Sequence, residues 1–410
     1  MAQEAAARAR ARDDLVRLVH RGLDVPAYAR AVNEVLRRIV PCEGTCLQTM
    51  DPATMLPTGD YVEDGLPSAE ILRLLEIELR EPDVNKWVAL RNAGATAAGL
   101  SQATGGDLDQ SLRQREVRRP GGFEDEVRVV LANRTGTWGG LTLFREANRP
   151  RFTPYEVDRV ASLAGLITDG LRRAALLGGA AVSDEAGVLV LNGDDSVAMC
   201  DRGAERWLER LEVSERAGAR LPLVISAVAR QTRALGAGDQ IRPTRAGDRP
   251  LARACAQTSS GWLLVRGSLL GDGPAAPVAV TLEAARTPEL APLIAAAYGL
   301  TERERRVTEL VARGQSTAQI ARGLHLSAYT VQDYLKSIFE KTGTSSRGDL
   351  VARLYFDHYA VRLSTDADDG RSAGTADEPG QAPWRPQPAG LPASAEVLGS
   401  SGRAGVAGRR

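Results

Sequence analysis

The sequence predicts a multidomain α+β protein whose last ordered part is a bundle of four short helices. A chain of 410 residues is longer than one ordinary hydrophobic core accommodates, so several domains are expected. Over the first 287 residues, runs with strand-like alternation intermingle with runs of helical spacing, which is typical of α+β domains. Residues 300–359 show helical spacing alone, and residues 363–410 are dominated by small and polar residues, which predicts a disordered tail.

The composition is that of a globular protein, with 43% hydrophobic and 25% charged residues. The 52 Lys and Arg residues balance the 52 Asp and Glu residues, so the net charge neither favours nor excludes a nucleic-acid partner. The first residues lack the apolar core of a signal peptide, and no apolar run reaches the length needed to cross a bilayer. Four cysteines are too few for a disulfide scaffold, so we expect reduced thiols and a cytoplasmic protein without a membrane partner.

The N-terminal half predicts one small α+β domain over residues 15–176, preceded by an extension over residues 1–14. Apolar residues recur at helical steps through the first forty residues, and the segment that begins at Gly44 alternates as a strand does. Residues 124–146 give the clearest strand signal, two alternating runs joined by a turn at 133–136. The other predicted segments are a helix at 68–81, an irregular polar stretch at 83–118 and a return to helical spacing at 152–177. Together they predict a mixed sheet with helices at both ends of the domain.

A second α+β unit is predicted over residues 183–287 from a weaker pattern. Its segments are two short strands around a turn in 187–200, a short helix at 203–211, and two later strands in 261–270 and 276–286. The sequence GDGP between the last two strands is a strong turn signal.

Two cysteines and two tryptophans are the candidate site residues of the N-terminal half. Cys42 and Cys46 lack the further ligands that a zinc site needs, so we expect two small, partly buried residues rather than a redox or metal site. Trp87 and Trp138 are candidates for lining a ligand pocket, although buried aromatic residues more often fill a core, which is the interpretation we favour. The pair Gly139–Gly140 inside a strand pattern predicts a bulge or a close approach of the backbone.

Residues 300–359 contain the start and stop signals of four short helices. Thr301 with Glu304 and Ser316 with Gln319 are capping-box pairs, in which side chains satisfy otherwise unpaired backbone donors. The remaining signals are Ser327 and Ser346 as N-caps and Gly314 and Gly343 at helix C-termini.

The third of these helices, about residues 328–341, is strongly two-sided. Its apolar half consists of Val331, Tyr334, Leu335, Ile338 and Phe339. We expect that half to pack on the two preceding helices, through Val307, Leu310, Val311, Ile320, Ala321 and Leu324. Gln332, Asp333 and Lys336 then project outward near the helix N-terminus, where a recognition helix presents side chains to base edges in the major groove.

The backbone donors and hydroxyls at the start of the second helix, Ser316 and Thr317, are suited to hold phosphates. The local charge is only mildly basic, because residues 299–362 contain ten Lys or Arg and seven Asp or Glu, a balance of 10 − 7 = +3. A helical bundle pattern alone is a weak indication of DNA binding.

The segment resembles the LuxR-type DNA-binding domain over some sixty residues, and this match is specific. The resembling positions are Thr301 to Glu304, Gly314, Ile320-Ala321, Leu324, Ser327, Thr330-Val331, Ile338, Lys341 and Gly343. The resemblance implies a helix-turn-helix domain over 296–361 whose third helix enters the major groove of double-stranded DNA, in a homodimer packed through the fourth helix. Base-facing candidates are Tyr329, Gln332, Asp333 and Lys336, and phosphate candidates are Ser316, Thr317, Ser327, Thr330, Lys341 and Arg347. Gln332 stands where the family frequently has Lys, and Tyr334 where it frequently has His, which leaves the operator sequence open.

More diffuse resemblances cover the rest of the chain. The first 176 residues are similar to a GAF-like sensor, through VPCEGTCLQTMDPATMLPTG and FTPYEVDRVASLAGLI, and 183–287 are similar to a PAS-like module. Together these imply a bacterial transcriptional regulator whose N-terminal half takes a small-molecule signal, with no cofactor indicated.

Other functions are weighed on the same residues. No P-loop is present and no doubly wound receiver pattern is seen, while the three histidines lie far apart as surface or packing residues. The N-terminal half shows no set of residues suited to act as general acid, general base or nucleophile, so we expect no catalytic site. A protein-docking bundle without DNA binding stays open, because the charge of +3 is small.

Overall fold

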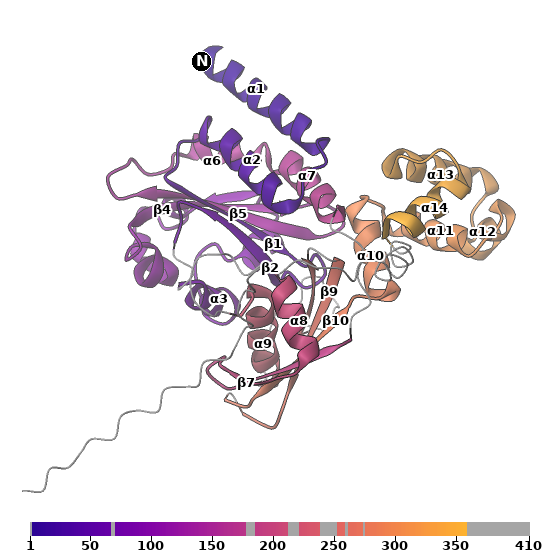
Figure 1. Cartoon of the computed structure of the whole chain (residues 1–410). Coiled ribbons are helices and arrows are strands. Elements are labelled where there is room, and N and C mark those ends of the chain that lie inside the picture. Colours follow the sequence, from indigo (N-terminus) through magenta and orange to yellow (C-terminus); the bar gives the residue numbers. More distant parts are fainter. Residues whose placement is uncertain are drawn as a thin grey trace, which may run out of the picture.

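The computed structural model describes residues 2–66, 70–177, 185–211, 221–237, 252–258, 261–273 and 275–358. Within these ranges it contains two five-stranded antiparallel sheets with their helices, followed by a helical bundle (Figure 1). The multidomain α+β class is therefore confirmed. The tail predicted at 363–410 lies outside the described residues. No helix in the described part of the chain combines the length and the apolar character needed to span a bilayer.

The first sheet has the strand order β2-β1-β5-β4-β3, and every pair in it is antiparallel. Its strands are β1 (Gly44–Met50), β2 (Pro57–Glu63), β3 (Ala97–Gly99), β4 (Phe123–Ala132) and β5 (Thr137–Glu146). The prediction of a mixed sheet is therefore wrong in one respect, because the sheet has no parallel pair among its described strands. Hairpins join β1 to β2 and β4 to β5, and the longer connections also return each neighbouring strand in the opposite direction.

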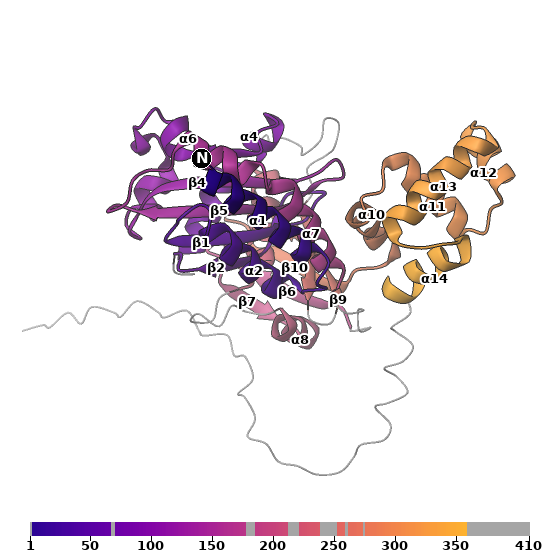
Figure 2. The ribbon, with the colours of Figure 1, turned by 90° about the horizontal axis from the view of Figure 1, so that it is seen from above.

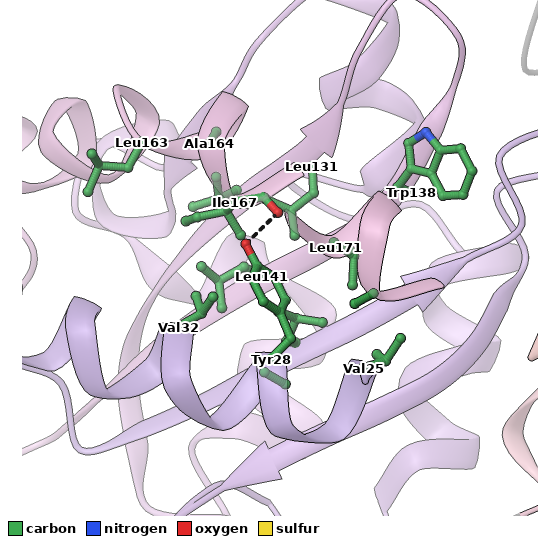
Figure 3. Close-up of a cluster of buried hydrophobic side chains, with 14 of the residues drawn as sticks. Val25, Tyr28, Val32, Leu131, Trp138, Leu141, Leu163, Ala164, Ile167 and Leu171 are labelled. Carbon is green, nitrogen blue, oxygen red and sulfur yellow. Dashed lines mark hydrogen bonds between the residues drawn. The ribbon is translucent and has the colours of Figure 1, made fainter. Parts of the chain in front are cut away.

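In the described part of the chain, three helices cover one face of this sheet and bury its apolar side chains: α2 (Val25–Arg37), α6 (Pro154–Ala161) and α7 (Ala164–Leu176). The helix α1 (Ala2–Val19) packs on α2 and α7 from outside. Tyr28 of α2 lies under α7, and its hydroxyl donates a 2.9 Å hydrogen bond to the backbone oxygen of Ile167 among buried aliphatic residues (Figure 3). The helix α1 is continuous across the predicted boundary between residues 14 and 15, and Ala11 is buried.

The segment 83–118, predicted to be irregular, contains regular structure. Its elements are α4 (Trp87–Asn92), β3, α5 (Leu100–Ala103), η2 (Leu108–Gln110) and η3 (Gln114–Arg118). Each element is short, so none repeats its apolar pattern often enough to be read from the sequence. The helix expected at 68–81 is α3 (Ile71–Leu79). In Figure 1, α3 lies on the side of the sheet opposite α1 and α2. Trp87 of α4 packs on that side too, with Met50 and Val130.

The second sheet repeats the strand order of the first, β7-β6-β10-β9-β8, with all pairs antiparallel. Its elements are β6 (Gly187–Leu191), β7 (Val197–Cys200), α8 (Arg202–Arg210), α9 (Leu223–Gly236), β8 (Arg253–Thr258), β9 (Gly261–Leu269) and β10 (Val278–Ala284). The sequence did not predict α9 or β8. The helix α9 is buried on most sides, so it shows no clear apolar stripe.

One helix connects the two sheet domains to the C-terminal bundle. This helix, α10 (Thr287–Ala297), buries Leu290 and Ile294 in the core of the first domain, and Ala295 lies in the core of the bundle. Arg172 of α7 donates hydrogen bonds to the carbonyl oxygens of Ala296 and Ala297 at the end of α10. The end of α10 is therefore held by the first domain, and the bundle begins directly after it (Figure 2).

Candidate nucleic-acid interface

The bundle consists of four short helices, as the sequence predicts. They are α11 (Glu302–Ala312), α12 (Thr317–Leu324), α13 (Ala328–Thr342) and α14 (Arg347–His358). Both capping boxes are present: Thr301 and Ser316 accept from the backbone N–H of Glu304 and Gln319, whose side chains accept from the cap residues' N–H groups. Ser327 caps α13 without a reciprocal bond, because its side chain alone accepts from the N–H of Thr330.

The turn between α12 and α13 begins with a residue that the sequence did not single out as a cap. His325 adopts the left-handed conformation, with φ of 53°, at the C-terminus of α12. Glycine is the usual residue there, because a Cβ atom makes this conformation costly. Gly343 does occupy such a position after α13, with φ of 66°. These two turns fix where α13 begins and ends.

The apolar half of α13 forms the centre of the bundle. Val331, Leu335 and Ile338 are buried and share one core with Ile320 of α12 and Val307 of α11. The partly buried members of that core are Leu324, Leu326, Tyr334, Phe339 and Leu354, together with Tyr298. The orientation of α13 is therefore set by its apolar residues, and its opposite face is left to solvent.

The four base-facing candidates lie on that opposite face. Gln332, Asp333 and Lys336 are exposed, and the Tyr329 side chain in the first turn of α13 is 73% exposed. Gln332 and Lys336 also border a shallow hollow that ends at Ser345, beyond the C-terminus of the helix. The structure thus places Tyr329, Gln332, Asp333 and Lys336 together on one accessible helix face.

The phosphate candidates are distributed less evenly. Ser316 and Ser327 lie at the N-termini of α12 and α13, where their side chains already act as caps, and Thr330 contacts the Ser327 hydroxyl. Arg347 donates to the backbone oxygen of Gln315 and to the hydroxyl of Thr317, so it links the start of α14 to the start of α12.

Lys341 has an internal partner that the sequence did not suggest. Its Nζ lies 2.7 and 2.6 Å from the two carboxylate oxygens of Glu304, and the Ser337 hydroxyl donates to the same carboxylate. The Glu304 side chain is 5% exposed and the Lys341 side chain is 33% exposed. Although burial alone favours the neutral acid, the hydrogen bonds from Lys341, Ser337 and Thr301 lower the pKa of Glu304 to about 2. This ion pair fastens α13 to α11.

The cysteines have the environment of packing residues. Cys42 and Cys46 carry free thiols, and burial raises their pKa to about 11 and about 12. A thiol must lose its proton to attack or to bind a metal, so both are poor nucleophiles and poor ligands at neutral pH. Among the described residues no group of three His, Cys, Asp or Glu side chains is arranged to hold a metal ion.

The two tryptophans occupy different places around the first sheet. Trp138 is buried in its main core and borders a small cavity with Cys255 and Trp262 of the second domain. Trp87 is 5% exposed, packs beside Gly140, and forms one wall of a larger hollow under the sheet. A Cβ atom on Gly140 would lie 2.6 Å from the Trp87 ring, so the close approach predicted at Gly139–Gly140 is a contact with this tryptophan.

Comparisons with known proteins cover the two ends of the chain unequally. Residues 299–354 match the family described as bacterial regulatory proteins, luxR family. The transcriptional regulatory protein DesR of Bacillus subtilis is 35% identical over 96 residues, which are 22% of this chain and 48% of DesR. The chain therefore spans about half the length of the curated relative that it matches.

Solved structures resemble the chain only weakly. A GAF domain/HD domain protein from Geobacter sulfurreducens is 16% identical with a TM-score of 0.27, covering 35% of this chain and 90% of that chain. Escherichia coli SdiA is 12% identical with a TM-score of 0.30, covering 84% of this chain and 94% of that chain. The capped four-helix bundle and the family match agree over the same residues, and the chain thus carries a C-terminal domain of the luxR family of bacterial regulatory proteins.

Proposed function

We propose that this protein is a sequence-specific transcriptional regulator that reads double-stranded DNA with α13. The observation that carries this proposal is the exposed polar face at the start of α13, formed by Gln332, Asp333 and Lys336 in a bundle of the luxR family. The major groove of B-DNA is wide enough to admit one helix. Gln pairs with adenine, Lys donates to guanine and Asp accepts from the amino group of cytosine.

The helix N-termini supply the contacts that position the bundle on DNA. Backbone N–H groups at the starts of α12 and α13 favour phosphate oxygens, because helix dipoles direct positive potential to these ends. Ser316, Thr317, Ser327 and Thr330 lie at these two ends, and Arg347 stands beside Thr317. Lys341 remains a weaker phosphate candidate, since its ammonium group is already paired with Glu304.

The resemblance to the family makes a homodimer on DNA the expected assembly, with α14 as its contact. The face of α14 that carries Gly348 and Val351 supports this proposal, because it borders a shallow apolar hollow with Val311 of α11. Val351 is 36% exposed in the single chain. An operator with two-fold symmetry follows from such a dimer.

We assign the binding of the signal that controls DNA occupancy to the N-terminal domains. These are a GAF-like sensor over 15–176 and a PAS-like module over 183–287. The contacts of α10 support this assignment, since this helix is packed in the core of the first domain and leads directly into the bundle. A ligand changes an equilibrium only through different affinities for its two states. A signal that alters how α10 sits on the first domain therefore alters the freedom of the bundle to dimerise on DNA.

The test is a genomic fragment pull-down with sequencing, comparing the intact chain with a Gln332→Ala, Asp333→Ala, Lys336→Ala triple variant. Removing Asp333 and Lys336 together leaves the net charge unchanged, so non-specific attraction to phosphates is nearly preserved. The matched control removes the exposed ion pair between Arg206 and Glu185, which is also neutral in sum.

We expect the intact chain and the control to enrich a short two-fold motif and the triple variant to lose it while circular dichroism shows it folded. Enrichment that persists in the triple variant contradicts the assignment of α13. If no variant enriches DNA and duplex binding shows no salt dependence, the bundle is a protein-docking module, the alternative that the small charge of +3 leaves open.

A further inference from the structure

A hollow lies between the first sheet and the pair α3 and α4, on the face opposite α1 and α2. Its cavity volume is about 100 Å³. Leu223 at the start of α9 closes one side, so both sheet domains contribute to the wall. The DNA-binding bundle takes no part in it.

The sheet face that forms the floor of this hollow carries polar side chains in two adjacent rows, beside the apolar Met50, Val62 and Phe144. Cys46 of β1 pairs with Thr142 of β5, which in turn pairs with Arg128 of β4, and these three side chains line the hollow in one row. Gln48 and Asp60 form the next row, across β1 and β2. The opposite face of the same strands instead buries Leu47, Val127, Val129, Leu141 and Leu143 in the main core.

Arg118, at the end of η3, is the most informative residue of the hollow. Its residue exposure is 6%, and its guanidinium lies 4.3 Å from the centre of the Phe144 ring. Its Nε donates a 3.2 Å hydrogen bond to Glu126, but its two terminal nitrogens donate to no described residue. Burial lowers the pKa of Arg118 to about 10, so it remains charged at neutral pH.

The terminal nitrogens of the neighbouring arginines, in contrast, bind carboxylates of the protein. Arg113 binds Asp83 and Glu126, and Arg128 binds Glu78 while it stacks over Trp87. Buried donors are nearly always paired, because each unsatisfied group costs the free energy of its lost hydration. Both terminal nitrogens of Arg118 lack a partner among the described residues at a position that lines the hollow, and the buried Nε of Arg128 beside it is also without one.

The remaining wall is apolar and adaptable. It is formed mainly by Met50, Met55, Leu74, Leu75, Leu79 and Trp87. Methionine side chains adjust to irregular shapes, and a tryptophan ring offers a flat apolar surface. A ligand that fits this hollow has a charged end that accepts hydrogen bonds and an apolar body.

We propose that this hollow binds a small carboxylate with an apolar body, whose carboxylate accepts hydrogen bonds from the terminal nitrogens of Arg118. The planar fork of a guanidinium matches a carboxylate in two parallel hydrogen bonds. The body lies between the methionines, Trp87 and α3, and Gln48 and Asp60 take up any further polar group on it. The proposal rests on the sensor role proposed above for residues 15–176 and names the class of its signal.

The position of α3 connects such a ligand to the second domain. Leu75 borders the hollow and also belongs to the core of the second domain. Glu76 on the same helix forms an ion pair with Arg230 of α9, which also binds Asp195. A ligand that moves α3 therefore moves α9 as well.

The test measures binding to the full-length chain in the absence of DNA, by calorimetry and ligand-observed NMR. The probes are linear carboxylates of six to ten carbons and 4-phenylbutyrate, each paired with its primary amide. We expect carboxylates to bind at least about tenfold more tightly than their amides, because a hydrogen bond to a charged group contributes that much. We expect Arg118→Gln to abolish this preference and the exposed neighbour Arg119→Gln to retain it.

A second variant protects the test against misfolding of Arg118→Gln. Ile71→Trp enlarges a side chain that borders the hollow and should weaken both members of every probe pair at an unchanged melting temperature. The proposal is overturned if no carboxylate binds at about 1 mM, if acids and amides bind equally, or if Arg118→Gln keeps the preference. Because DNA is absent, none of these outcomes depends on the assignment of α13.

Discussion

Glu304→Gln tests how α13 is held in the bundle. The carboxylate of Glu304 joins three parts of the domain: the cap at Thr301, and Ser337 and Lys341 of α13. Glutamine has nearly the same shape and retains an oxygen acceptor, but it loses the charge. The variant therefore removes the ion pair between α11 and α13 while it leaves the packing of the core in place.

Two routes give similar magnitudes for this loss. Lowering a carboxyl pKa from 4.5 to about 2 corresponds to about 3 kcal/mol of stabilisation at neutral pH. A hydrogen bond to a charged group contributes about 1.5 to 3 kcal/mol. The Lys341 side chain is 33% exposed, so solvent screens its charge and weakens the ion pair. We therefore expect a loss of about 2 kcal/mol, or about a 30-fold change in the opening equilibrium.

Hydrogen exchange measured by mass spectrometry on the full-length chain reports this loss. Peptides from α11 and α13 should exchange about 30-fold faster in Glu304→Gln at neutral pH. The matched control is Glu302→Gln, two residues earlier on the same helix, where the side chain is 78% exposed and the change should stay below about twofold. Equal exchange in the two variants, or an unchanged α13 in Glu304→Gln, refutes the reasoning.

The same residue predicts a pH dependence whose sign is fixed by the lowered pKa. The folded state holds Glu304 ionised to about pH 2, whereas the unfolded chain protonates it near its ordinary value of 4.5. Its contribution is complete above that ordinary value and is lost as the pH falls towards 2. The stability difference between the intact chain and Glu304→Gln should therefore shrink on going from neutral pH to about pH 3. A difference that stays constant over this range contradicts the assigned pKa.

Three further variants test the N-terminal domains and their connection to the bundle. Gly140→Ala places a Cβ 2.6 Å from the Trp87 ring, so thermal unfolding should show a loss of about 1 to 3 kcal/mol; no loss means that the ring has room to move. Arg113→Met leaves two buried carboxylates without their main partner and should cost about 3 to 5 kcal/mol in chemical denaturation, where a neutral result contradicts the ion pairs. Arg172→Gln removes the donors at the end of α10, so hydrogen exchange in α10, relative to β4, should be faster than in the intact chain. Unchanged protection of α10 would show that its apolar contacts suffice.

The bundle illustrates what can be predicted from sequence when the signals are local. Thr301 with Glu304 and Ser316 with Gln319 are three residues apart, and both capping boxes form as expected. The N-terminal half shows the opposite case. The sequence does not predict α9, because this helix is buried on most sides. The elements of 83–118 are too short for a helical or strand-like spacing of apolar residues to be recognised.

The sequence by itself determined the boundaries of the C-terminal helices, the exposed face of α13 and the relation to the luxR family. These features depend on residues within a few turns of one another, so spacing alone defines them. Only the tertiary structure decided that Lys341 pairs with Glu304, 37 residues away, and that Arg118 faces a hollow walled by α3, α4 and α9. Such contacts join segments far apart in the chain, and which segments meet is decided by the packing of whole helices and sheets.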